Sequence, residues 1–177
     1  MRKFISLAML FFLFGCTSSL TFSEENEPFI EYEYGNYGPD LIYNLYSTEI
    51  ILYGDGKGRV RTPINEEIGI DENAPHTVEF ELEAEDVESL QSEIETSNFF
   101  SLPEDLSEMD VMDGGYEYIT VHTIDQSKTA GGSNPDNETI NALSEQIMEI
   151  VPSGIVGSFH EGIENYQMEK GLRESLN

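Results

Sequence analysis

The chain has 177 residues, of which 35 are Asp or Glu and 8 are Lys or Arg, so its formal net charge is −27 at pH 7. This acidity excludes a nucleic-acid-binding protein, because such proteins need Lys and Arg side chains to neutralise phosphates. A single Cys excludes an internal disulfide framework and a zinc site built from several Cys residues. The length and the 38% hydrophobic content suit one domain with one modest core.

The first sixteen residues carry the pattern of an export signal. Arg2 and Lys3 precede an apolar run over residues 4–14, which has the length of a signal-peptide core and is too short to span a bilayer. The run ends in Leu-Phe-Gly-Cys, with Gly15 followed by Cys16, which resembles the lipobox of bacterial lipoproteins. The resemblance implies that a peptidase cleaves after Gly15 and that acyl chains on Cys16 anchor the mature chain to a membrane. The alternative is an ordinary secretory signal in which Cys16 has no special role.

The lipobox also predicts how the chain is divided and where it resides. Residues 1–15 are the predicted signal peptide, and residues 16–28, which are mostly small, polar or acidic, are a predicted lipid-anchored tether. A folded domain is predicted over residues 29–154, and residues 155–177 are a predicted tail of uncertain order. The predicted location is extracytoplasmic, with the chain lipid-anchored to the cell membrane through Cys16, in the outer membrane if the organism is Gram-negative.

Alternation of apolar and acidic residues predicts the first strand of the domain. Tyr32 and Tyr34 face one way, and Glu31 and Glu33 face the other, as in a half-buried strand. A glycine-rich hairpin turn, Gly54–Gly58, is predicted to join the second and third strands. The predicted strands cover residues 29–34, 47–53, 59–62, 77–82, 116–124 and 128–130.

Two helices are predicted from apolar residues at spacings of three and four. The first runs over residues 83–97 and has acidic residues at its start. The second begins with Asn134 as N-cap and Pro135 at its first position. The predicted inner faces consist of Val87, Leu90, Gln91 and Ile94 in the first helix and Ile140, Leu143, Ile147 and Ile150 in the second. The order of elements predicts an α+β fold, with a mainly antiparallel sheet of five to six strands and two helices packed on one face.

The sequence contains no recognisable catalytic motif. The histidines, His76, His122 and His160, have no metal-ligand spacing, and no Ser lies in a nucleophile elbow. His122 is predicted to lie on a half-exposed sheet face, where a packed histidine is commoner than a catalytic base. We therefore expect a protein that is not an enzyme and that has no cofactor.

An acidic loop over residues 104–115 is the best candidate for a cation site. Its carboxylates, including Asp110 and Asp113, supply the oxygen ligands that Ca²⁺ prefers. The spacing does not match an EF-hand, and acidic clusters arise by chance in a chain this rich in Asp and Glu. No metal site is therefore predicted, and Asp110 and Asp113 are retained only as candidates for a calcium-binding surface module.

The acidity itself has two interpretations. It could form a binding face for a basic partner, or it could keep an exported protein hydrated at high salt or high pH. The acidic residues are spread over nearly every segment instead of forming one block, and this distribution favours halophilic or alkaliphilic adaptation.

Residues 46–151 carry a pattern of motifs that resembles small uncharacterised bacterial lipoprotein domains and, more distantly, emfourin-like inhibitors of thermolysin-type metalloproteases. The motifs are Ile50–Gly58, Asn98–Pro103, and Asp113-Gly114-Gly115 before a strand over residues 116–121. No inhibitory residue can be matched. The expected function is a non-catalytic, lipid-anchored binding module of the cell envelope, whose partner is an extracytoplasmic protein such as a protease or another envelope component. The alternatives are a metalloprotease inhibitor and a calcium-binding module.

Overall fold

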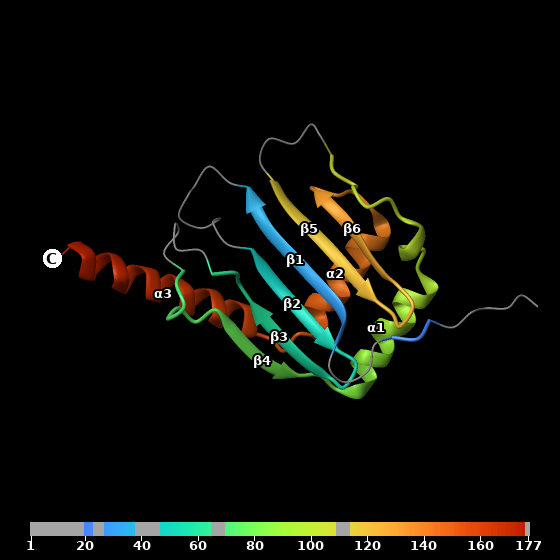
Figure 1. The fold of residues 1–177 in the computed structure, drawn as a ribbon, viewed down its shortest axis with the longest axis horizontal. Coiled ribbons are helices and arrows are strands. Elements are labelled where there is room, and N and C mark those ends of the chain that lie inside the picture. Colours follow the sequence, from blue (N-terminus) through green and yellow to red (C-terminus); the bar gives the residue numbers. More distant parts are fainter. Residues whose placement is uncertain (1–19, 23–26, 38–46, 65–69, 109–113, 176–177) are drawn as a thin grey trace, which may run out of the picture.

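The computed structural model of the chain describes residues 20–22, 27–37, 47–64, 70–108 and 114–175. These residues form a six-stranded sheet in which every neighbouring pair is antiparallel, with strand order β4-β3-β2-β1-β5-β6 (Figure 1). The strands are β1 (Pro28–Tyr37), β2 (Thr48–Tyr53), β3 (Lys57–Arg61), β4 (Thr77–Glu81), β5 (Gly114–His122) and β6 (Ser127–Ser133). The predicted α+β class and the antiparallel sheet are confirmed.

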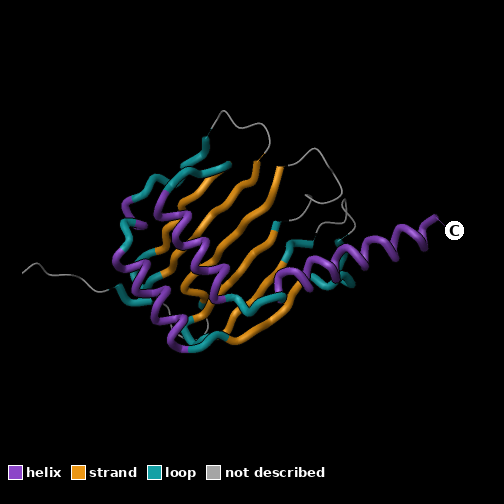
Figure 2. The backbone as a smooth tube through the Cα atoms, turned by 180° about the vertical axis from the view of Figure 1, so that it is seen from behind, coloured by secondary structure: helices purple, strands orange, loops and turns teal. Residues whose placement is uncertain are grey.

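The helices lie on one face of this sheet (Figure 2). They are α1 (Ala84–Thr96), α2 (Glu138–Ile150) and α3 (Ile155–Ser175), and a short 3-10 helix, η2 (Phe99–Ser101), follows α1. Helices α1 and α2 pack against each other, whereas α3 contacts β3 and β4 and then extends past the edge of the sheet. The packing of helices on one face is as predicted, but the described residues contain three helices instead of two.

Helix α3 occupies the segment that was predicted to be a tail of uncertain order. Phe159 and Ile163, one turn apart, are 2% and 0% exposed and belong to the main core. Further along the helix, the Tyr166 hydroxyl and the Lys170 ammonium donate to the two carboxylate oxygens of Asp71, at 2.5 and 2.9 Å. These two hydrogen bonds hold the pKa of Asp71 well below its usual range, so its carboxylate fixes α3 to the loop before β4.

The start of α2 differs from the prediction. The N-cap is Asn137, whose side-chain oxygen accepts hydrogen bonds from the backbone N–H groups of Thr139 (3.0 Å) and Ile140 (3.2 Å). Asn134 instead has φ of 46° and accepts a hydrogen bond from the Gly115 backbone N–H at 2.8 Å. Its left-handed conformation makes the turn out of β6, and the helix can therefore begin only after that turn.

The core lies between the sheet and the helices. Strand side chains at alternate positions, such as Ile30, Ile50 and Ile119, are fully buried against the predicted inner faces of α1 and α2. The hydroxyl of Tyr32 donates to Glu117 at 2.9 Å. Burial, reinforced by the charge of Glu117, raises the pKa of Tyr32, so the hydroxyl stays protonated as a donor.

The β2–β3 connection is the predicted hairpin turn. Gly56 has φ of +87°, a conformation that glycine adopts without the steric cost of a Cβ. The turn sets the β2–β3 register, in which Glu49 faces Arg61 and Ile51 faces Arg59. This register places the charged residues of both strands on the side of the sheet opposite the helices.

Candidate functional site

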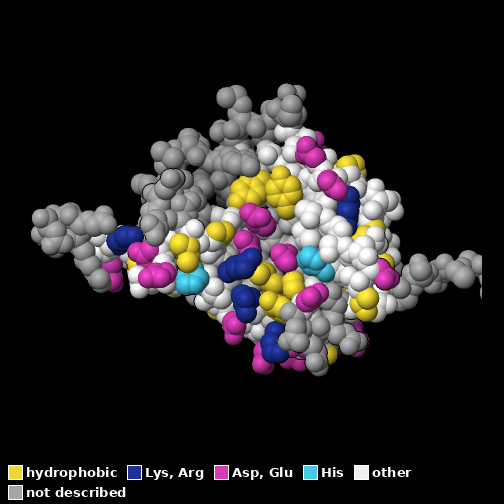
Figure 3. All heavy atoms as spheres, in the orientation of Figure 1, with side chains coloured by type: hydrophobic (Ala, Val, Ile, Leu, Met, Phe, Trp, Pro, Cys, Tyr) yellow, Lys and Arg dark blue, Asp and Glu magenta, His cyan; other side chains and the backbone are white. Residues whose placement is uncertain are grey.

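The face of the sheet opposite the helices is uncovered by any described helix, and we call it the open face (Figures 1 and 3). It is built by strand alternation, because every second residue of each strand points to this side. The pairing registers place on it Glu31, Glu33, Glu49, Ile51, Lys57, Arg59, Arg61, Thr77, Glu79, Glu81, Tyr116, Tyr118, Thr120, His122, Ser127 and Thr129. The open face is therefore mainly polar and charged.

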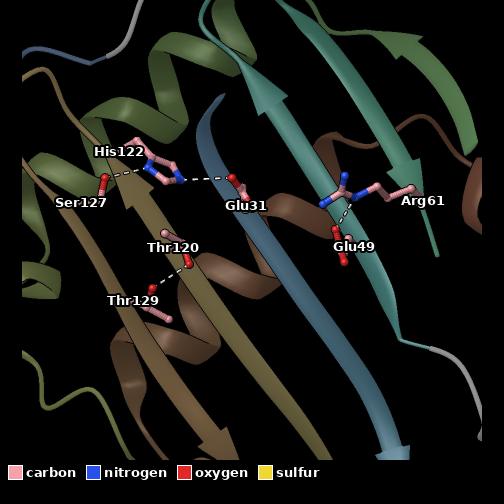
Figure 4. Close-up of polar contacts among 7 residues, drawn as sticks. All are labelled: Glu31, Glu49, Arg61, Thr120, His122, Ser127 and Thr129. Atoms are coloured by element: carbon pink, nitrogen blue, oxygen red, sulfur yellow. Dashed lines mark hydrogen bonds and ion pairs between the residues drawn. The ribbon is translucent and has the colours of Figure 1, made fainter. Parts of the chain in front are cut away.

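Basic residues gather on the open face in an otherwise acidic chain. Lys57, Arg59 and Arg61 occupy alternate positions of β3, so all three lie on this side, and they account for three of the eight Lys and Arg residues in the sequence (Figure 3). Arg59 Nη2 donates to Glu79 at 3.2 Å, and Arg61 Nε donates to Glu49 (Figure 4). The side chains of Arg59 and Arg61 remain 37% and 44% exposed, so their ion pairs are accessible to a partner.

A second polar cluster lies across the sheet on β1, β5 and β6 (Figure 4). His122 Nδ1 is 2.8 Å from the Ser127 hydroxyl, and His122 Nε2 is 3.2 Å from a carboxylate oxygen of Glu31. The contact with Glu31 has an ion-pair distance but not hydrogen-bond geometry, and Nε2 has no hydrogen-bond partner among the described residues. Beside it, the hydroxyls of Thr120 and Thr129 are 2.9 Å apart.

This cluster has the residue types of a Ser-His-carboxylate triad, but the backbone N–H of its serine is not placed to stabilise an oxyanion. In acyl transfer, N–H donors aimed at the developing oxyanion supply the largest stabilisation of the transition state. Residues 122 and 127 are opposite each other in the ladder, and the Thr123 N–H bonds the carbonyl of Gln126 at 2.8 Å. The N–H of Ser127 therefore points sideways in the plane of the sheet, away from any substrate lying on the open face.

Three hollows lie side by side on the open face. One of about 470 Å³ is lined by Tyr53, Lys57, Arg59, Glu79 and Glu81, among others. A second of about 440 Å³ shares Arg59 with the first and has Arg61, Pro63 and Ile64 in its wall. A third of about 230 Å³ shares Glu49 and Arg61 with the second and reaches Tyr118 and Thr129. Arg59 and Arg61 thus separate adjoining hollows that cross the sheet from β4 to β6.

The other two histidines, His76 and His160, make hydrogen-bond contacts that support the fold. His76 Nδ1 is 2.8 Å from the carbonyl of Ala74 in the loop before β4. His160 Nε2 is 2.9 Å from the hydroxyl of Thr48, which is 2% exposed. Burial lowers the pKa of His160 below its ordinary value, and the nearby Glu164 opposes this shift. A neutral His160 therefore joins α3 to β2.

The residues chosen from the sequence lie mainly outside this region. Gly15 and Cys16, and the candidate ligands Asp110 and Asp113, are outside the residues that the structure describes. Of the same acidic loop, Glu104 lies 3.8 Å from the ammonium of Lys128, and Asp105 accepts from the Ser107 backbone N–H at 2.9 Å. Within the described ranges, no group of three His, Cys, Asp or Glu side chains is arranged to hold a metal ion.

Comparison of the chain with protein-family models and with curated proteins finds no match. Over the residues that the structure describes, no helix combines the length and the apolar character needed to cross a membrane. The open face was not identified from the sequence, although the Lys-Gly-Arg-Val-Arg pattern of residues 57–61 already places three basic residues on one side of a strand. The pairing of Ser127 with His122 depends on the β5–β6 register.

Proposed function

We propose that the chain is a non-catalytic, lipid-anchored binding module of the cell envelope, located outside the cytoplasm, and that it binds its partner through the open face. The observation that carries the proposal is the row of hollows around Arg59 and Arg61 on a sheet face that no described helix covers. The Gly15-Cys16 lipobox supports the anchor and the location. No metal, cofactor or nucleic acid has a part in this function.

Ion pairs on the open face can be exchanged for contacts with a partner. A surface ion pair contributes only about 0–1 kcal/mol, so breaking the Arg59–Glu79 pair or the Arg61–Glu49 pair costs little. The guanidinium group then offers a planar fork of donors to a carboxylate of the partner, and the released Glu49 and Glu79 accept basic groups. We therefore infer a partner that presents both signs of charge, which is typical of a protein surface.

Site-specific photocrosslinking in intact cells tests this use of the open face. A photoreactive residue in place of Thr120, on the open face, is expected to capture one envelope component, whereas the same residue in place of Glu88, on the exposed side of α1, is expected not to. The double variant Arg59→Ala, Arg61→Ala should lose the capture at position 120. Lys128→Ala also removes a positive charge but lies off the open face, and it should keep the capture. Equal capture from both faces would contradict the proposal.

The anchor has its own test. Cells supplied with labelled palmitate are expected to label the wild-type protein and not Cys16→Ser, because only the thiol of Cys16 is acylated. The acyl chains also hold the protein on the membrane, since each buried methylene contributes about 0.8 kcal/mol of membrane affinity. The mass of the N-terminal peptide after membrane extraction should show acylated Cys16 as the first residue. An unmodified Cys16 in a secreted protein would leave the binding module without its anchor.

The absence of catalysis is tested with the His122 cluster. Purified full-length protein is expected not to turn over a panel of ester, amide and glycoside substrates. Turnover that disappears in both His122→Ala and Ser127→Ala would replace the proposal with a hydrolase. Titration against a thermolysin-type metalloprotease separates a general envelope partner from the inhibitor implied by the emfourin resemblance: inhibition at micromolar protein would identify the protease as the partner.

A further inference from the structure

The two edges of the sheet differ. At the β6 edge, the segment over residues 104–108 pairs with the strand through three backbone hydrogen bonds: Leu106 N–H to Gly131 O (2.8 Å), Gly131 N–H to Glu104 O (3.2 Å) and Glu108 N–H to Ser133 O (2.9 Å). At the opposite edge, β4 has β3 as its only strand neighbour among the described residues. A free edge is a template for pairing with another chain.

The hydrogen bonds that flank β4 show which of its backbone groups point outward. Leu82 N–H donates to Gly56 O at 2.7 Å, and Thr62 N–H donates to His76 O at 3.1 Å. Because an antiparallel ladder alternates, the residues between these pairs that bond to β3 are Val78 and Phe80. The N–H and C=O groups of Thr77, Glu79 and Glu81 therefore lie in the plane of the sheet and point outward from its β4 edge, away from β3.

The side chains of β4 also differ between its two faces. Thr77, Glu79 and Glu81 lie on the open face and are exposed, with the Glu79 side chain 75% exposed despite its pairing with Arg59. Val78 and Phe80 point toward the helices and join the core. A strand added beside β4 would therefore have one row of side chains next to carboxylates and the other row next to apolar side chains.

We propose that the β4 edge binds an extended segment of a partner protein in which Lys or Arg alternates with apolar residues. Three outward-pointing residues provide up to six backbone hydrogen bonds, and Glu79 and Glu81 select the basic row. This proposal goes beyond binding at the open face and does not depend on it, because the edge is recognised through its backbone.

A second copy of the chain fits this edge poorly. A two-fold axis centred on Glu79 would place Glu79 opposite its counterpart and each Glu81 opposite Thr77, and other registers set acidic residues against acidic residues or Thr. Like charges directly opposite each other in a sheet are destabilising. The carboxylates thus disfavour self-pairing at an edge that stays open to a basic partner.

Amide hydrogen exchange of the full-length protein in detergent tests the proposal. The probe is an eight-residue peptide of alternating Val and Lys, and the control is the same peptide with Glu in place of Lys. With the Lys peptide at about ten times its Kd, exchange at Thr77, Glu79 and Glu81 is expected to slow about tenfold, because only about one site in ten is then free. The amides of Val78 and Phe80, already bonded to β3, should not change. General attraction to an acidic protein would not produce this alternation.

A pair of variants separates the contribution of the residue 79 backbone N–H to peptide binding from the contribution of the Glu79 carboxylate. Glu79→Pro removes an outward N–H that β3 does not use, and it is expected to weaken binding of the Lys peptide at least tenfold. Glu79→Gln keeps the N–H and loses the same ion pair with Arg59, so it should weaken binding only about two- to fivefold. The open-face variant Arg59→Ala, Arg61→Ala should retain peptide binding, and this distinguishes the edge from the face.

Three results would overturn the proposal. One is the absence of slowed exchange at millimolar Lys peptide. Another is equal slowing by the Glu peptide or in Glu79→Pro. The third is slowing at Thr77, Glu79 and Glu81 that depends on protein concentration without any peptide, which would make a second copy the occupant. If Glu79→Pro does not fold, the exchange pattern of the wild-type protein still decides.

Discussion

Replacing Ile163 by Ala tests whether α3 is part of the folded domain. Ile163 is fully buried, and with Phe159 it fixes α3 to the rest of the core. The substitution removes three carbon atoms at about 0.8 kcal/mol each, and the remaining cavity adds to the loss, so the expected destabilisation is about 3–4 kcal/mol. Because α3 contacts β3 and β4, this packing also supports the strands that carry the basic residues and the open edge.

Urea denaturation followed by circular dichroism measures this loss. With a slope of about 2 kcal/mol per molar urea, the midpoint of Ile163→Ala should fall by about 1.5–2 M. The control is Met168→Ala in the same helix, where the side chain is 60% exposed and the expected change is within about 0.5 kcal/mol. If the two variants unfold at the same urea concentration, α3 does not pack on the domain and the reasoning is wrong.

The sheet could be predicted because most of its strands are half buried. In β1 and β4, acidic residues alternate with apolar ones, and this pattern identifies strand and face together. Strand β5 is recognisable instead from its β-branched and aromatic residues, and its one acidic residue, Glu117, lies on the side of the helices. Strand β6 was underestimated as residues 128–130, since it continues through Gly131 and Gly132 to Ser133. Glycine has low strand propensity, but a Cβ at Gly131 would lie 2.1 Å from the carbonyl oxygen of Glu117, so only glycine fits this part of the strand.

Helix α3 could not be predicted because its packing is carried by few residues. Among the α3 residues whose burial the structure describes, only Phe159 and Ile163 are buried, and three glycines, Gly157, Gly162 and Gly171, weaken the local helical signal. Its polar contacts join residues far apart in the sequence: Tyr166 and Lys170 bind Asp71, 95 and 99 residues earlier, and His160 contacts Thr48. Periodicity within the segment contains no information about such a partner.

Prediction of the open face would have required knowledge of the strand order. The sequence indicates which residues of a strand share a face, but the contact between His122 and Glu31 joins residues far apart in the chain and exists only because β1 lies between β2 and β5. In the same way, Arg59 meets Glu79 because β3 pairs with β4. Even so, the ion pairs on this face use only a few of the 35 acidic residues, so adaptation to high salt or high pH stays a separate prediction for the remainder.

Substitutions at three further positions test the fold and its pH dependence. Gly131→Ala should lower the free energy of unfolding, measured in urea, by about 2–5 kcal/mol, because φ is +154° and the new Cβ would clash with the carbonyl of Glu117. A loss below about 1 kcal/mol would show that β6 does not pass this close to β5 at Gly131. Asn137→Ala should cost about 1 kcal/mol through loss of the α2 cap, whereas Asn137→Ser should largely retain the stability. Burial keeps the pKa of His160 below its ordinary value, with Glu164 opposing the shift, so as the pH falls the unfolded chain takes up a proton before the folded chain does. Stability should therefore be independent of this group well above pH about 6.5 and should decrease as the pH falls below that value, until the pKa of the folded state is passed. The glutamine of His160→Gln cannot be protonated, so this variant should lose the part of the pH dependence of stability that His160 causes. The urea midpoints of the two proteins, measured between pH 8 and pH 5.5, show the difference directly. Because the carboxylates titrate alike in both proteins, parallel curves would mean that His160 is not buried against Thr48 as a neutral ring.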